Sequence, residues 1–160
     1  MSPLREAYSV ELVVAQSDAL LLLAEKVRDA ADGFLRFSRD EPWNADLQIV
    51  MRYSLTELMG AAARARRGVF SAMVDNLRLA ADCILRIYTS APPELLQLQS
   101  SLEAAAQERE EPQDAVQDAT LWAPFQKPAL RLATQYPAFE AIRRLKIRQN
   151  GSAIYTVTLQ

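Results

Sequence analysis

The residues that could do chemistry in this chain are few, and their types favour binding over catalysis. The 160 residues include no histidine and a single cysteine, Cys83. Without histidine the chain lacks the usual general base near neutral pH and the commonest metal ligand, and a cysteine–histidine nucleophile is excluded. The four glycines, at positions 33, 60, 68 and 151, are too scattered to form a phosphate-binding loop.

Carboxylate pairs remain as candidates for acid–base or metal chemistry. Asp29/Asp32 and Glu110/Glu111 are such pairs, but paired carboxylates on amphipathic helices normally face water. No spacing argues for a carboxylate-only Mg²⁺ or Ca²⁺ site. We therefore expect no enzymatic activity, no metal and no cofactor, and we interpret Cys83 as a small packed hydrophobe.

Cations gather at the C-terminal end of the chain. Residues 1–126 carry 12 Lys/Arg against 19 Asp/Glu, whereas 127–160 carry six Lys/Arg and one glutamate. Cations beside a stackable ring are typical of a nucleic-acid contact surface, although the net charge of −2 argues against that function. The candidate phosphate contacts are Arg143, Arg144, Lys146 and Arg148.

Four helices are predicted to form the body that positions these groups. Apolar residues at steps of three and four predict a first helix over 4–37, and this stripe comprises Tyr8, Leu12, Ala15, Ala19, Leu22, Leu23, Val27, Ala30, Phe34 and Phe37. Asn44 is expected to cap a second helix. The cations Arg64, Arg66 and Arg67 are expected in its last turn, where they complement the helix dipole. A third helix is predicted over 69–89 and a fourth from about Pro93.

The region after the fourth helix differs from the preceding one in the spacing of its prolines. Four prolines divide it, and they predict short helices near 113–122, 127–135 and 138–146. We expect a mainly α fold with a four-helix bundle-like body over 1–111. Residues 112–160 are expected to form short helices and a basic C-terminal β-hairpin, packed on the body as one domain.

The hairpin is predicted from the sequence "KIRQNGSAIYTVTLQ". Asn150-Gly151 favours a two-residue turn, which would pair Arg148 with Ala153 and Lys146 with Tyr155. Leu145, Ile147 and Ile154 would then share one face, opposite Tyr155, Val157 and Leu159. The edge of 153–159 would be completed by the bundle, by a strand of another chain, or not at all, as in a disordered tail.

These features together predict a protein–protein interaction or assembly subunit, such as an adaptor, regulator or small scaffold component. It would use its helical faces and an exposed hairpin edge, with partner contacts at Ile154, Tyr155, Val157 and Leu159. A first helix longer than its neighbours also suggests oligomerisation, with a second copy or another protein as the partner. A small helical subunit of a nucleoprotein complex is the alternative function. No apolar run is long enough for a membrane span, and the cysteine usage favours the cytoplasm.

Overall fold

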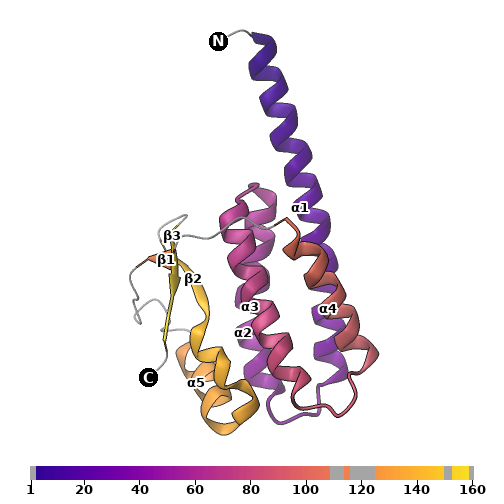
Figure 1. Cartoon of the computed structure of the whole chain (residues 1–160), viewed down its shortest axis with the longest axis vertical. Helices are drawn as coiled ribbons and strands as arrows, with labels where there is room; N and C mark the ends of the chain where they lie inside the picture. Colours follow the sequence, from indigo (N-terminus) through magenta and orange to yellow (C-terminus); the bar gives the residue numbers. More distant parts are fainter. Residues whose placement is uncertain (1–2, 109–113, 116–124, 150–152, 159–160) are drawn as a thin grey trace.

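Four long helices form an up-and-down bundle in the computed structural model, which describes residues 3–108, 114–115, 125–149 and 153–158. They are α1 (Pro3–Phe37), α2 (Asn44–Ala63), α3 (Arg67–Leu85) and α4 (Pro93–Ala106). Each helix packs on the next along the chain, and α4 packs back on α1 (Figure 1). The predicted mainly α body is therefore confirmed.

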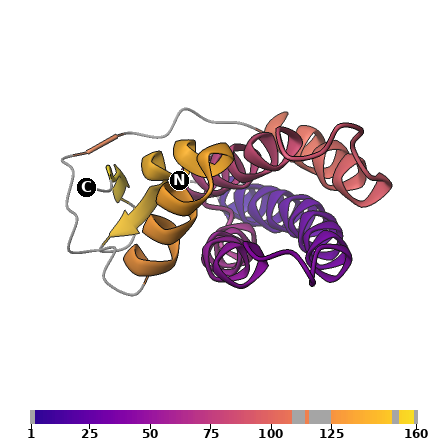
Figure 2. The ribbon, with the colours of Figure 1, turned by 90° about the horizontal axis from the view of Figure 1, so that it is seen from below.

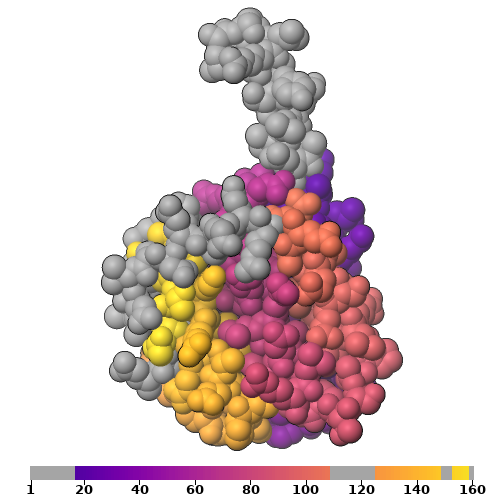
Figure 3. All heavy atoms as spheres, in the orientation of Figure 1, coloured from indigo at the N-terminus to yellow at the C-terminus, as the bar shows by residue number. Residues whose placement is uncertain are grey.

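The C-terminal elements cover one side of this bundle. Helix α5 (Gln126–Gln135) contacts α2, while the 3₁₀ helix η2 (Pro137–Arg144) and strand β2 (Lys146–Gln149) contact α3. They form a layer beside α2 and α3, with α4 on the other side of the bundle (Figure 2). Figure 3 shows α3 between α4 and the C-terminal elements. The predicted helix over 138–146 thus ends at Arg144, since the backbone of Leu145 is extended.

Helix α1 has two apolar sides, and the predicted stripe mixes them. The side that faces the core follows steps of four and three, and its fully buried members are Leu20, Ala24, Val27, Ala31 and Phe34. Ala19 is exposed, and Leu22 and Phe37 are 55% and 47% exposed. These three residues of the predicted stripe therefore do not face the core. Successive residues lie about 100° apart around a helix, so residues one or two positions from a buried residue can point to another side.

The sequence predicted that Asn44 caps α2, but the structure shows that it does not. The helix begins at Asn44 itself, after Trp43. The buried Asn44 amide instead donates to the backbone oxygen of Leu35 at 3.1 Å and to the Ser38 hydroxyl at 3.0 Å. It thereby satisfies a carbonyl at the end of α1 and fixes the turn between the first two helices.

The C-terminal hairpin is confirmed, with a register one residue from the predicted one. Ile147 pairs with Tyr155 and Arg148 with Ile154 in the antiparallel pair of β2 and β3 (Ala153–Thr156). Directly paired residues share a face, so Ile147 lies with Tyr155, and the predicted division of the two faces is wrong. The amide of Val157 continues this register, because it donates to the oxygen of Leu145 at 3.0 Å.

A third strand was not predicted. β1 (Asp114–Ala115) pairs in parallel with β3, which gives the sheet the order β1-β3-β2. The helix predicted near 113–122 is therefore wrong at positions 114–115, and the rest of that range lies outside the described residues. Across the described part of the chain, no helix has the length and apolarity needed to cross a membrane.

Candidate interaction surfaces

The described side chains, within 17–108, 125–148 and 153–158, offer no cluster of three or more acidic, cysteine or histidine ligands for a metal ion. Cys83 is buried at 1% exposure. Desolvation raises the pKa of its thiol above the ordinary value of 9.0. A raised pKa opposes the thiolate form on which cysteine nucleophiles depend, so the packed-hydrophobe interpretation fits the surroundings of this residue.

A buried thiol and a partly buried phenol predict a loss of stability in alkaline solution. Burial raises the pKa of Cys83 above 9.0 and that of Tyr53 above 10.0. Their contributions are complete below those unfolded-state values and disappear as the pH rises through the folded-state values. We expect the free energy of unfolding, measured with urea, to fall between about pH 8 and 11. Cys83→Ala combined with Tyr53→Phe should make this fall shallower, and an unchanged slope would contradict the assignment.

The hairpin edge expected to be open is covered by the chain itself. β3 is the central strand, because β1 pairs with it at Ile154 and Tyr155. On the other side of β2, the Asn76 amide accepts from the Lys146 N–H at 2.8 Å and donates to the Lys146 oxygen at 2.6 Å. The Tyr53 hydroxyl accepts from the Arg148 N–H at 3.1 Å. The prediction of an exposed hairpin edge is therefore wrong for the described residues of β2 and β3.

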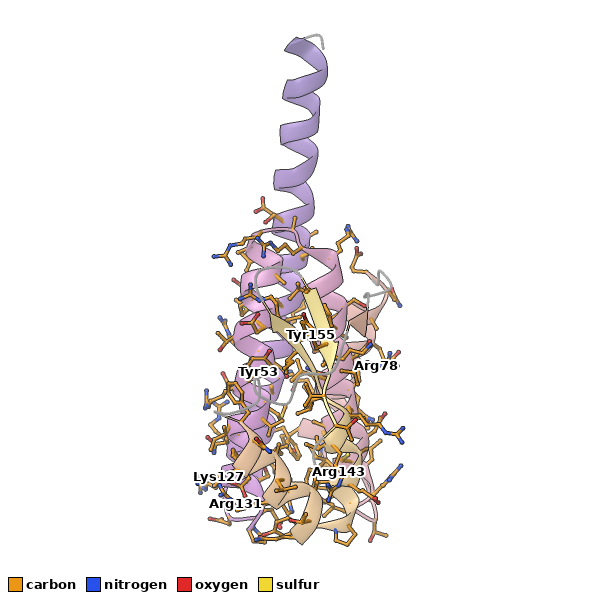
Figure 4. All side chains as sticks on the ribbon, turned by 90° about the vertical axis from the view of Figure 1, so that its left-hand side faces the viewer. Tyr53, Arg78, Lys127, Arg131, Arg143 and Tyr155 are labelled. Atoms are coloured by element: carbon orange, nitrogen blue, oxygen red, sulfur yellow. The ribbon has the colours of Figure 1, made fainter. Side chains whose placement is uncertain are left out.

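The residues predicted to contact a partner have different surroundings. Ile154 and Val157 are 3% and 1% exposed, so their side chains pack within this chain. Tyr155 is partly buried, and Figure 4 shows it on the sheet. Leu159 lies outside the described residues. The first two side chains therefore have a structural role, and Tyr155 also packs partly against the core.

Two of the four cations predicted to contact nucleic acid face acidic residues of the bundle. Lys146 Nζ lies 3.3 Å from an Asp75 carboxylate oxygen of α3, and Arg148 Nε lies 2.5 Å from that of Glu57 of α2. The hydrogen bond to Glu57 raises the pKa of the Arg148 guanidinium. Arg144 is exposed on η2, and Arg143 of the same helix is partly buried (Figure 4). Acidic residues of the bundle therefore compensate part of the positive charge that the C-terminal sequence carries.

Arg64, Arg66 and Arg67 do not lie in the last turn of α2, as predicted, because that helix ends at Ala63; they follow it and have two different roles. Arg67 begins α3 and its Nη1 lies 2.8 Å from a Glu108 oxygen, which ties the start of α3 to the end of α4. Arg64 and Arg66 instead line a cavity together with Arg148 of β2. The structure thus brings together two basic clusters that are far apart in the sequence, a proximity that no spacing indicated.

Helix α1 is longer than the bundle that it belongs to. The Ser17 hydroxyl donates to the oxygens of Ala62 and Ala63, at 3.0 and 2.8 Å, and Ala63 is the last residue of α2. Residues 3–16 therefore continue past that end of the bundle (Figure 1). At roughly 1.5 Å per residue this part of α1 is about 21 Å long. The predicted length difference between the helices is present in the structure.

Large apolar side chains are also exposed on the bundle. They come from several elements, and the most exposed are Leu22 of α1 and Leu96 of α4, at 55% and 53%; the others are Phe37, Ile49 and Ile87. Single exposed apolar residues are normal in globular proteins. Leu22 and Phe37 both lie on α1, the helix that continues beyond the bundle, and Leu22 is the one nearer to that continuation.

Comparison of the chain with protein-family models, with curated protein sequences and with solved structures gave no match.

Proposed function

We propose that this chain is a non-catalytic assembly subunit, such as an adaptor, regulator or small scaffold component, that binds another protein or a second copy of itself through helical faces. The observation that carries the proposal is the extension of α1 past the bundle, fixed by the contact of Ser17 with the end of α2. A helix of this length without packing partners is only marginally stable in water. A partner chain that packs along residues 3–16 supplies that stabilisation.

The spacing of apolar residues along α1 supports a helix as the partner. Tyr8, Leu12, Ala15, Ala19 and Leu22 follow steps of four, three, four and three, which is the spacing of a coiled-coil seam. We call these five residues the α1 seam. Its two members with described side chains, Ala19 and Leu22, are exposed on the bundle surface. A second copy of the chain offers the same seam and is the partner we test first.

Replacing Leu22 with glutamate is expected to weaken self-association by about 30-fold or more, since a charge would enter the apolar contact at the bundle end of the seam. The measurement is the mass in solution by light scattering across a dilution series, with absorbance at 260 and 280 nm on the same peak. Leu96→Glu is the matched control, because Leu96 is equally exposed on α4. A monomer at every concentration, or an equal effect of both changes, contradicts self-association through the seam.

A nucleic-acid-associated role is the second candidate, favoured by the meeting of Arg64, Arg66 and Arg148 around one cavity. Against it, Lys146 and Arg148 already face Asp75 and Glu57. In the same experiment, a peak with raised absorbance at 260 nm that salt removes supports this candidate over the first. A reducing cytoplasmic setting for the buried, unpaired Cys83 is part of the proposal.

A further inference from the structure

A cavity of about 220 Å³ lies where the end of α2 meets the start of α3 and β2. The charged residues that line it are Arg64, Arg66, Arg148 and Glu57, which give a net charge of +2. At roughly 30 Å³ for each water molecule, this space holds a tetrahedral oxyanion with several waters. A cluster of guanidinium groups around a solvent-filled hollow is a favourable environment for an anion.

The turn after α2 places two of the three arginines. The N–H of Arg66 donates to the oxygen of Ala61 at 2.8 Å, and that of Ala65 donates to Ala62 at 3.2 Å. With a φ of 52° at Ala65, these bonds form a Schellman motif, which closes the helix and reverses the chain. Arg64 and Arg66, on either side of the left-handed residue, both reach the cavity.

A glycine leaves the space that one of these side chains occupies. Arg64 Nη1 lies 3.3 Å from the position that a Cβ on Gly60 would take. Gly60 precedes Arg64 by about one turn and lines the same cavity. Because Gly60 has no side chain, the Arg64 guanidinium can lie close to the α2 backbone at the cavity wall.

The third arginine is held rigidly by its neighbours. Arg148 donates to both oxygens of Glu57, at 2.5 Å from Nε and 3.4 Å from Nη2. Its backbone N–H donates to the Tyr53 hydroxyl at 3.1 Å. Strand β2 and helix α2 therefore fix this guanidinium at the cavity wall as part of an ion pair with Glu57, so its position is preorganised.

We propose that this cavity binds a phosphate group. Planar guanidinium forks match the oxygens of phosphate bidentately, and Thr56 adds a hydroxyl to the same wall. The phosphate belongs either to a small phosphorylated molecule or to a nucleic-acid backbone. The site is independent of the α1 seam, so the two proposals stand or fall separately.

The test is a titration of the full-length chain, labelled with ¹⁵N, with pyrophosphate in one series and a short single-stranded DNA in another. Binding of either should shift the amide signals of residues around the cavity, such as Gly60 and Val69. Arg64→Ala should weaken it about tenfold or more, as the loss of a charge-assisted hydrogen bond predicts. Arg39→Ala is the control, since Arg39 is an exposed arginine just after α1, at the other end of the bundle.

A second variant gives an effect of opposite sign. Glu57→Gln removes the one carboxylate found among the described residues that line the cavity and should tighten phosphate binding several-fold. Shifts with pyrophosphate that Arg64→Ala abolishes assign the site to small phosphorylated molecules, and shifts with DNA alone assign it to a polymer backbone. The proposal is overturned if neither ligand shifts these signals, or if Arg64→Ala and Arg39→Ala weaken binding equally.

Discussion

Replacing Phe34 with alanine is expected to lower the free energy of unfolding by about 3–5 kcal/mol, the range for large-to-small changes at a buried phenylalanine. Phe34 is fully buried at the end of α1, where it joins three elements. Its ring stacks on Trp43 at 6.3 Å between centroids and meets the edge of Tyr88 at 6.5 Å. The change would leave a cavity between the start of α2 and the end of α3, and the surrounding aromatic rings cannot collapse fully into it.

The control for this change lies less than one turn away. Phe37 is on the same helix and its ring lies 6.1 Å from that of Phe34, but its side chain is 47% exposed. Phe37→Ala is therefore expected to cost about 1 kcal/mol or less. Urea unfolding followed by circular dichroism measures both values. Equal losses would mean that the aromatic cluster does not anchor the bundle.

The helices were largely predictable because their signals are local. Pro93 starts α4 where proline is tolerated in a first turn, and apolar periodicity located α1 to within a residue at each end. What periodicity could not decide was which of two apolar sides of α1 faces the core. Leu20 and Leu22 have the same chemistry, and only the packing of α2 and α4 buries one and exposes the other.

The sheet was less predictable because its determinants are distant in sequence. Asn150-Gly151 correctly indicated a hairpin, but the pairing follows a register one residue away. That register joins Leu145 to Val157 and lets Asn76 of α3 reach the Lys146 backbone. Tertiary packing thus overrides the local turn preference. The β1 residues Asp114–Ala115 have low strand propensity, and they pair with the edge that β3 offers.

The candidate sites show the same limit. The cationic character of Lys146 and Arg148 was visible in the sequence, but their acidic neighbours, Asp75 and Glu57, belong to helices far away along the chain. The gathering of Arg64 with Arg148 was equally hidden. A sequence shows which charges exist, whereas the fold decides which are compensated and which line a cavity together.

The second large effect on the free energy of unfolding is expected at Asn76, which contacts a residue far away along the chain. Asn76→Leu is expected to lower the free energy of unfolding by about 2–4 kcal/mol, although the two side chains have the same number of heavy atoms. The amide makes two hydrogen bonds to Lys146, at 2.6 and 2.8 Å, and is only 3% exposed. Leucine would leave the N–H and the oxygen of Lys146 without partners beside an apolar group, which costs the desolvation of both. Urea unfolding gives the magnitude.

Hydrogen exchange separates this mechanism from a general loss of packing. In Asn76→Leu the amide of Lys146 should exchange much faster than the core amides of α3, because opening β2 no longer requires breaking that bond. Lys146→Met is the control. It removes the ion pair between Lys146 and Asp75, in which each side chain is about a fifth exposed. It keeps the backbone groups that Asn76 binds. It should cost clearly less than Asn76→Leu, because both charged groups keep partial contact with water. If it costs as much as Asn76→Leu, the sheet is held to the bundle by charge, and the amide that mimics a neighbouring strand is secondary.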